Sequence, residues 1–426
     1  MKITYTISAL FAFVSAVPLS SDVASRQTNA CHTPAILDAN TNIFLNRTLH
    51  PHSVWRNQTL SAAQNIVDKE IQKRALKASE IGTFVWIEKP EDISRIVEEA
   101  KDVPCNHTLG LLLTGLPYKK CPSIGIPPTA DPWSYEDVFL KPIVRAIQAN
   151  PTVAFTVIVE PFVIGEIVAN LELSSCAHVR RSWRQNVPLA LRSLDLPNVV
   201  LYLDAAHGGW LGWKELQNSA AKEIANTWLN AGPLKQFRGV AVNVASYNAW
   251  DMTPGEMFEG ENTCYDLLNP ARNEQRHLTI LTRNIRKLNI TMPLHGIMDT
   301  SRNGQQGVRR KWSEWCNVGG WLFESDNNDF GAGFGVVPSS NTKDANLDAF
   351  VWAKNGGVSD GTSDPTSRFY DSGCGEPTSM KHMPERGGFS PLYFEILLRN
   401  ARPRDIGSKR SVVAPHFVAR GAQMCG

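Results

Sequence analysis

The amino-acid sequence predicts an α/β protein built as a single distorted (β/α) barrel of seven or eight parallel strands, similar in plan to a TIM barrel. Three observations predict this fold. The chain has 426 residues, of which 42% are hydrophobic and 20% are charged, so it can bury a large core. Short β-rich apolar runs alternate with amphipathic stretches. The runs are continuously apolar, which is typical of parallel strands covered on both faces.

The alternation begins after Ala75 and provides seven or eight strand–helix units. The expected strands are residues 83–87, 109–114, 155–160, 199–204, 239–244, 294–299, 320–323 and 349–353. The expected helices include Tyr135–Ala149, Lys214–Asn230 and Glu274–Lys287. Gly- and Ser-rich stretches at residues 331–340 and 356–367 predict long loops over one end of the barrel.

The N-terminus predicts export. An apolar stretch, Ile7–Val17, follows Lys2, and the small residues Ser15 and Ala16 precede the expected cleavage point. We therefore expect a signal peptide over residues 1–16, an N-terminal extension over residues 17–50, and a barrel domain over residues 51–426 without a separate carbohydrate-binding module. No later apolar run reaches the ~20 residues that a membrane span needs, so we expect a secreted, extracellular protein with no membrane partner.

Charge and cysteine usage exclude several classes of function. The 43 Lys and Arg residues nearly balance 41 Asp and Glu residues, so no nucleic-acid partner is expected. The eight cysteines show no metal-ligand spacing, and in an exported chain they predict up to four disulfides. We expect no metal and no other cofactor, and we expect a monomer. Four glycosylation sequons, at Asn46, Asn57, Asn106 and Asn289, agree with secretion.

Acidic and amide residues stand at the ends of four predicted strands: Glu160, Asp204, Asn243 and Asp299. Strand ends of a parallel barrel carry functional side chains, although such residues can equally cap the following helices. Twelve tryptophans are many for this length. Five of them, Trp210, Trp213, Trp250, Trp312 and Trp315, lie in loop segments after predicted strands, where aromatic rings can stack on sugars. Core packing is the competing interpretation of each one.

Four motifs, in order along the chain, closely resemble glycoside hydrolase family 6, which contains fungal cellobiohydrolases and endoglucanases. They are LDAAHGGWLGW, NVASYNAW, KWSEWCNVGG and FVWAKNGGVSDGTSD. The resemblance covers about residues 83–403 and implies a distorted barrel, a β-1,4-glucan ligand and hydrolysis with inversion. It implies two disulfides, Cys121–Cys176 and Cys316–Cys374, and leaves Cys31, Cys105, Cys264 and Cys425 unassigned.

The resemblance also implies roles for individual residues. Asp360 matches the proposed general base, while Lys354 and Asp204 match residues that hold and tune the catalytic carboxylates. The residues expected to contact sugar are His207, Trp210, Trp213, Asn248, Trp250, Arg302, Trp315 and Lys354.

The chain departs from the family pattern where the proton is donated. The family's general acid is an Asp directly after Glu-Pro, and Phe162 stands there. A second Asp, which assists this acid, is matched by Lys120, and a nearby Tyr is matched by Thr114. A phenyl ring donates no proton. A lysine within ~4 Å would oppose a cationic transition state by on the order of 4 kcal/mol.

Two other carboxyls are candidate replacements for the acid. Glu160 lies two residues before Phe162, but the family keeps a Glu there and still needs its Asp. Glu166 is expected on the first turn of the following helix, where the helix dipole should lower its pKa and make it a poorer acid.

The sequence leads to three hypotheses. The first is a secreted, cellulase-like pseudoenzyme that binds β-1,4-glucan with little or no hydrolysis. The alternative is an active inverting glycosidase that takes its proton from a non-standard acid. The third is a surface effector with no sugar ligand, and it does not explain why tryptophans follow the predicted strands.

Overall fold

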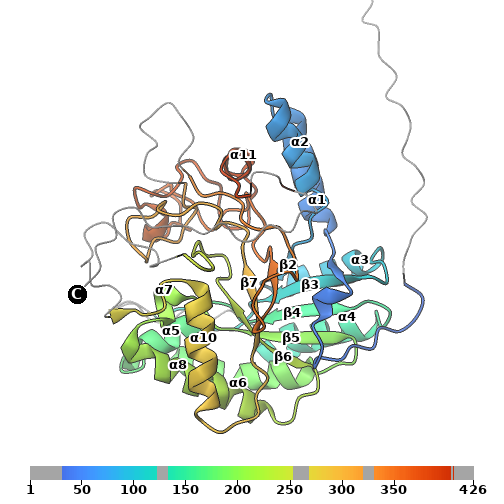
Figure 1. Ribbon diagram of the computed structural model, residues 1–426, viewed down its shortest axis with the longest axis vertical. Helices are drawn as coiled ribbons and strands as arrows, with labels where there is room; N and C mark the ends of the chain where they lie inside the picture. Colours follow the sequence, from blue (N-terminus) through green and yellow to red (C-terminus); the bar gives the residue numbers. More distant parts are fainter. Residues whose placement is uncertain (1–30, 122–132, 253–267, 320–330, 404–405, 407–426) are drawn as a thin grey trace, which may run out of the picture.

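The computed structural model describes residues 31–121, 133–252, 268–319, 331–403 and 406. Its centre is an eight-stranded parallel sheet that curls into a nearly closed barrel (Figure 1). The strands are β1 Thr48–Leu49, β2 Phe84–Ile87, β3 His107–Leu113, β4 Phe155–Val159, β5 Val199–Asp204, β6 Phe237–Val242, β7 His295–Asp299 and β8 Leu347–Val351. β3 to β8 follow one another in chain order, and both β1 and β2 pair with β3.

The predicted barrel is confirmed. Seven of the eight predicted strands match β2 to β8, and the eighth, residues 320–323, lies outside the described residues. Because β2 and β8 form the two edges of the long sheet, the barrel is open between them. The Trp86 indole on β2 crosses this gap and donates a hydrogen bond of 2.8 Å to the carbonyl of Ala353, just after β8.

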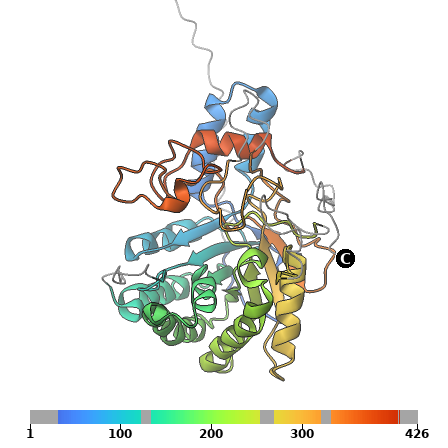
Figure 2. The same ribbon diagram turned by 90° about the vertical axis from the view of Figure 1, so that its left-hand side faces the viewer.

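The helices form two groups. One group surrounds the barrel and consists of α3 Ser94–Ala100, α4 Lys141–Gln148, α5 Val163–Ala169, α6 Ala177–Ser193, α7 Gly208–Leu211, α8 Lys214–Ala231 and α10 Glu274–Arg286. The second group, α1 Ser53–Asn65, α2 Lys69–Ala78 and α11 Pro391–Arg399, lies with the late loops at one end of the molecule (Figures 1 and 2). Short turns are η1 Ile43–Leu45, η2 Pro90–Ile93, the π-helical η3 Tyr135–Leu140, η4 Ser174–Cys176 and η5 Ser372–Cys374.

Local sequence explains where several helices begin. Asp68 accepts hydrogen bonds from the amides of Glu70 and Ile71 at the start of α2. Asn273 caps α10 in the same way, and Ser390 caps α11 directly before Pro391. These caps satisfy amides that have no partner within the helix.

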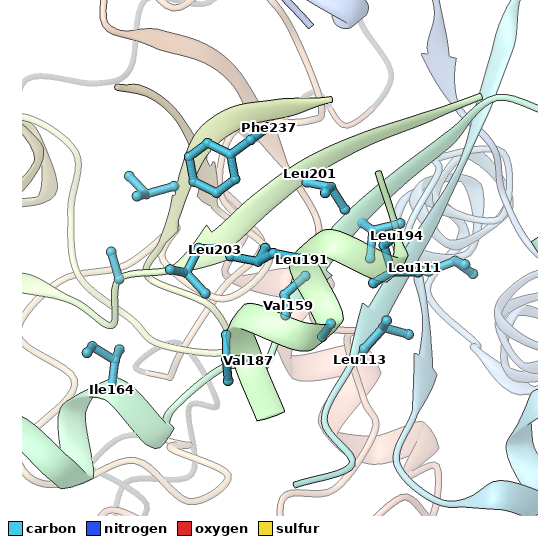
Figure 3. Packing of buried hydrophobic residues seen from close by; sticks show 14 of the residues in the cluster. Leu111, Leu113, Val159, Ile164, Val187, Leu191, Leu194, Leu201, Leu203 and Phe237 are labelled. Carbon is cyan, nitrogen blue, oxygen red and sulfur yellow. The ribbon is translucent and has the colours of Figure 1, made fainter. Parts of the chain in front are cut away.

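The two faces of the barrel wall bury different clusters. The outer face packs against α4, α5, α6 and α8 through residues such as Leu111, Val159, Leu191 and Leu203 (Figure 3). The inner face fills the barrel with alternate strand residues, including Phe84, Leu112, Ile158, Tyr202, Ile297 and Val351. The interior is therefore packed, as in other (β/α) barrels, and functional groups have to lie at its open end.

A buried ion pair closes the end of the barrel where the strands begin. Arg238 and Asp348 lie 2.7 Å apart with side chains 6% and 3% exposed, and the Tyr202 hydroxyl donates to the same carboxylate at 2.8 Å. Arg238 also donates to the carbonyls of Ala39 and Asn40. Residues of the predicted N-terminal extension thus pack onto the barrel, and the ordered fold begins before residue 51.

Three disulfides link distant segments of the described chain. Cys121–Cys176 and Cys316–Cys374 confirm the predicted pairs, and Cys31–Cys105 ties the N-terminal segment to the loop before β3. Cys264, Cys425 and the predicted signal peptide lie outside the described residues. None of the described helices is long and apolar enough to cross a membrane, and no group of three metal-ligating side chains occurs among the same residues.

Candidate functional site

Phe162 lies in the turn between β4 and α5, at the end of the barrel where the strands finish, which we call the barrel mouth. Its φ of +76° is in the left-handed region, and Glu160 two residues earlier has a φ of +49°. The Phe162 amide donates a 3.0 Å hydrogen bond to Asp204 at the end of β5. The phenyl ring is half-buried against the inner cluster, and its centre lies 6.3 Å from that of the Trp86 ring.

Asp204 is buried directly behind this turn. Its Oδ2 accepts hydrogen bonds from the amides of Phe162 and Ala206, at 3.0 and 3.1 Å. Its Oδ1 is buried with no hydrogen-bond partner among the described residues. Burial raises the pKa of Asp204 to about 7, although the two amides favour the charged form. The carboxyl therefore supports the Phe162 turn from inside the barrel.

Glu160 is also a buried, structural carboxyl. It accepts hydrogen bonds from the amides of Gly115 and Leu116 and, at 2.9 Å, from the Tyr135 hydroxyl. Burial raises the pKa of Glu160 to about 7, while the charge of Lys119 acts in the opposite direction. Its three donors hold it away from the open mouth, with no surface exposed.

Glu166 lies on the first turn of α5, as predicted, but the predicted direction of its pKa is wrong. Burial raises the pKa of Glu166, and this effect exceeds the lowering by the Cys121 amide and by Lys120. The helix dipole does not decide the outcome because the side chain is partly removed from water. Its Oε2 accepts the Cys121 amide at 3.1 Å, next to the Cys121–Cys176 disulfide.

Lys120 has a carboxylate partner, which offsets the charge that was expected to oppose a cationic transition state. Its ammonium lies 2.8 Å from Asp371 and 5.3 Å from the centre of the Trp315 ring. The lysine side chain is 64% exposed. The charge that stands in place of the family's Asp is therefore neutralised and directed to the surface.

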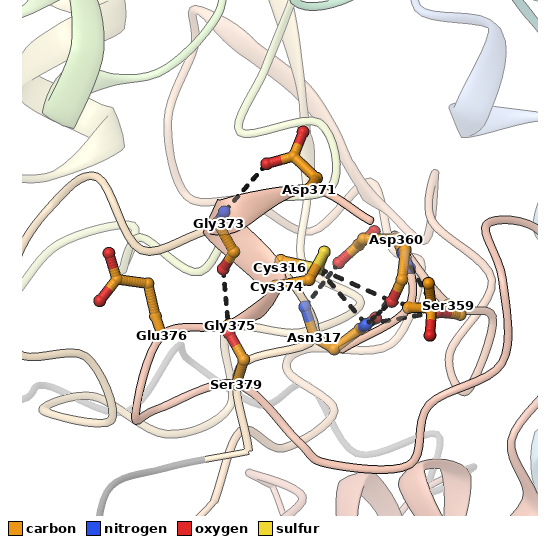
Figure 4. The surroundings of a disulfide bond; sticks show 12 residues. Cys316, Asn317, Ser359, Asp360, Asp371, Gly373, Cys374, Gly375, Glu376 and Ser379 are labelled. Atoms are coloured by element: carbon orange, nitrogen blue, oxygen red, sulfur yellow. Dashed lines mark hydrogen bonds between the residues drawn. A yellow bond between two sulfur atoms is a disulfide. The ribbon is translucent and has the colours of Figure 1, made fainter. Parts of the chain in front are cut away.

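Asp360 lies in the segment after β8, between two cations. Its oxygens are 2.5 Å from the Arg302 guanidinium and 2.9 Å from the Lys354 ammonium, and the Asn317 amide donates to it at 2.9 Å. Burial alone would raise its pKa, but Arg302 and Lys354 hold the pKa of Asp360 well below its usual range. Figure 4 shows Asp360 and Asp371 around the Cys316–Cys374 disulfide.

The two cations are themselves fixed. Arg302 is 1% exposed and stacks on Tyr247, with its guanidinium carbon 4.4 Å from the ring centre. The Lys354 ammonium lies 4.9 Å from the centre of the Trp86 ring. Arg302, predicted as a polar contact for sugar, is thus buried and acts on Asp360.

Asp299 behaves as the structural cap that the sequence left as an alternative. It accepts four backbone amides, from Ala245, Ser301, Ala353 and Lys354, at 2.8 to 3.1 Å. These amides belong to the segments after β6, β7 and β8. One carboxylate therefore positions three loops of the mouth.

His207 and Asn248 belong to one network after β5 and β6. The Asn248 amide group lies 3.2 Å from His207 Nδ1 and donates to Glu274 at 2.7 Å, while Arg309 donates to its oxygen at 2.6 Å. Burial and then the charge of Arg309 lower the pKa of His207 to about 3. The imidazole is therefore neutral and can exchange hydrogen bonds with hydroxyl groups.

Residues 44–401 match the family model described as glycosyl hydrolases family 6. The chain belongs to glycosyl hydrolase family 6. It is 38% identical over 411 residues to the 1,4-beta-D-glucan cellobiohydrolase CEL6C of Podospora anserina. The aligned region covers 95% of this chain and 99% of that protein.

Solved structures of family 6 enzymes share the fold. A mutant of the cellobiohydrolase Cel6A from Humicola insolens, in complex with methyl-tetrathio-alpha-d-cellopentoside, has a TM-score of 0.76 at 27% identity, over 86% of this chain and 100% of that chain. The endoglucanase CEL6B from Humicola insolens has a TM-score of 0.70 at 28% identity, over 85% and 99% of the two chains.

Within this family 6 barrel, the tryptophans predicted to bind sugar are of two kinds. Trp213 and Trp315 keep partly exposed rings, and Trp213 meets Trp312 edge to face at 6.1 Å. Trp250 is 6% exposed and packs against Phe350, and Trp210 lies over Gly165 of α5. The structure thus places Trp250 in the protein core, in line with the competing interpretation, whereas Trp210 is half-buried with its ring centre 5.9 Å from that of His207.

Sequence reasoning missed two residues of the site, Trp86 and Asp371. Trp86 ends an apolar strand and looks like core in sequence, yet its ring is half-buried at the mouth. No sequence pattern pointed to Asp371, because its partner Lys120 is 251 residues away in the chain. The position of Trp86 at the end of a predicted strand was the available clue.

Four carboxyls of this family 6 mouth, Asp360, Asp204, Glu160 and Glu166, differ in what they can do. An inverting hydrolase needs one carboxylic acid and one carboxylate that activates water on the opposite face of the sugar. Asp360 is ionised but paired with two cations, whereas Asp204 and Glu160 are fully buried. Among these four, only Glu166 combines partial exposure with a raised pKa.

Proposed function

We propose that this family 6 chain is a secreted protein that binds β-1,4-glucan at the barrel mouth with little or no hydrolysis by the family's mechanism. The observation that carries the proposal is the Phe162 ring, in the β4–α5 turn where the family's motif has its acid. A general acid contributes about a hundredfold to ten-thousandfold to a rate, and a phenyl ring contributes none of it.

Retained features support ligand binding. The exposed ring of Trp315 and the partly exposed rings of Trp213 and Trp312 suit the flat faces of glucosyl rings, and the neutral His207 suits hydroxyl groups. The Humicola insolens Cel6A structure, which carries a thio-linked cellopentoside, shares this fold. Export is supported by the predicted signal peptide and by three disulfides in the described chain. We propose a monomer that needs no cofactor.

The test combines binding and turnover in one panel of soluble β-glucans and cello-oligosaccharides. Calorimetry should detect binding of cellohexaose, while a reducing-sugar assay over the same concentrations should remain at background. An active family 6 cellobiohydrolase serves as the positive control for turnover. Release of reducing ends at the control's rate would overturn the proposal, as would failure to bind any member of the panel.

A second candidate is an active glycosidase that uses Glu166 as its acid. Partial exposure and a pKa raised by burial are what such a donor requires. Its contact with the Cys121 amide directs the carboxyl toward the disulfide, which favours binding without turnover. If turnover is measured, Glu166→Gln should abolish it, whereas Glu172→Gln, on the following exposed turn, should leave it unchanged.

A further inference from the structure

Phe162 occupies a position that is unfavourable for its side chain in two ways. Its φ of +76° is in a region that Asn, Asp and Gly enter easily and bulky residues rarely occupy. Its ring also remains partly exposed at the barrel mouth. Backbone strain of this kind concentrates at functional sites, where the surrounding structure maintains it.

The surroundings hold the ring in one place. The amide of Phe162 is fixed by Asp204, and the ring rests on the inner cluster beside Trp86, with 33° between the two ring planes. Trp86 is fixed in turn by its hydrogen bond to Ala353 and by the Lys354 ammonium near its face. Two aromatic rings therefore form a fixed, partly exposed apolar surface at the mouth, which we call the Phe162–Trp86 platform.

We propose that Phe162 is a sugar-binding residue and that the Phe162–Trp86 platform stacks against a β-glucosyl ring in its undistorted chair form. This inference rests on the proposed function and adds to it. In this view the replacement of the acid does not only remove catalysis, because it adds apolar surface that favours the bound ground state. Tight ground-state binding with no matching transition-state contact is the energetic pattern of a binding protein.

The platform also predicts which sugars bind. In a β-glucosyl chair all hydroxyl groups are equatorial, so both ring faces present C–H groups to an aromatic surface. An axial hydroxyl, as in β-mannose, places a polar group on one face and costs desolvation on an apolar platform. A β-1,4-linked glucan should therefore bind better than a β-1,4-linked mannan of the same length.

The test compares variants with and without a ring at position 162. Phe162→Tyr keeps the ring, Phe162→Leu removes it, and Phe162→Asn removes it with a residue that accepts the left-handed backbone. Calorimetric titration with cellohexaose should show about threefold to tenfold weaker binding for the Leu and Asn variants and less than about a twofold change for Tyr. Thermal unfolding of each variant confirms that it is folded.

The matched control is Phe369→Leu, which removes a 52% exposed ring outside the platform and should not change affinity. Mannohexaose should bind more weakly than cellohexaose to the wild type, and the difference should shrink in Phe162→Leu. Unchanged cellohexaose affinity in both ring-less variants would overturn the platform while leaving the proposed function standing. Failure of the wild type to bind cellohexaose would instead overturn the proposed function.

Discussion

The two sides of the barrel mouth carry different side chains. On the side of the expected general base, after β7 and β8, which we call the base side, Asp360 pairs with Arg302 and Lys354 and accepts one backbone amide. The side chains of the three charged residues are 8% exposed or less. On the side of the expected acid, after β3 and β4, which we call the donor side, Phe162 stands where the family's motif has its Asp, and Lys120 forms an exposed ion pair with Asp371.

The comparison shows that the backbone of a turn can suit one kind of side chain while the turn carries another. The left-handed turn at Phe162 and its hydrogen bond to Asp204 would suit an Asp, which tolerates positive φ, better than they suit a phenyl ring. Buried Asp204 fixes the turn through the Phe162 amide, and the Glu160 side chain, at the start of the turn, is anchored to Gly115 and Tyr135. Under the proposed function, this backbone shape is kept without a proton donor at position 162.

The largest expected effect is a gain of hydrolysis when the donor side is rebuilt. The double variant Phe162→Asp with Lys120→Asp should raise reducing-sugar release from cellohexaose about a hundredfold or more over the wild type. Either change alone should do little. Phe162→Asp alone lacks the second carboxyl that the family's motif has at position 120 to assist the acid, and Lys120→Asp alone supplies no donor.

A matched double variant, Phe162→Asn with Lys120→Asn, controls for changes in shape without adding a carboxyl. No gain in the Asp double variant would mean that the base side has also lost its function, and the contrast between the two sides would fail.

The second prediction compares the ion pairs of the two sides. Arg302→Met leaves Asp360 buried with one cation fewer and should lower the free energy of unfolding by about 3 to 5 kcal/mol. Lys120→Met breaks an exposed pair and should cost less than about 1 kcal/mol. Chemical denaturation measures both. Equal losses would show that the buried network is no more important to the fold than the surface pair.

The third prediction concerns Asp204, which accepts the amide of Phe162 on the donor side. Burial raises its pKa to about 7, above its ordinary value of about 3.9, so the folded state holds more protons than the unfolded state between these pH values. This carboxyl therefore lowers the free energy of unfolding as pH rises through that window. Relative to the wild type, Asp204→Asn should gain about 2 to 3 kcal/mol between pH 5 and pH 8.

Urea denaturation at a series of pH values tests this prediction. Glu160→Gln should show the same sign, because burial also raises the pKa of Glu160 to about 7. A difference between Asp204→Asn and the wild type that stays flat with pH would mean that Asp204 ionises normally in the fold.

Sequence alone predicted most of the barrel because its signals are local. Continuous apolar runs marked the strands, and amphipathic segments marked helices such as α8 and α10. The missed features depend on contacts between distant segments. The Lys120–Asp371 pair joins residues 251 apart, and Trp86 meets Phe162 only after β2 and β4 both align with β3. The pKa of Glu166 depended on burial, which helix position does not give.

The most direct test of binding without hydrolysis is a crystal structure of the wild-type protein soaked with unmodified cellohexaose. We predict one unbroken chain across the barrel mouth, with a glucosyl ring in its chair form against Phe162. Two shorter sugars separated at this position would show that the linkage has been cleaved and would contradict the proposal. A mouth without bound sugar under saturating cellohexaose would contradict it equally.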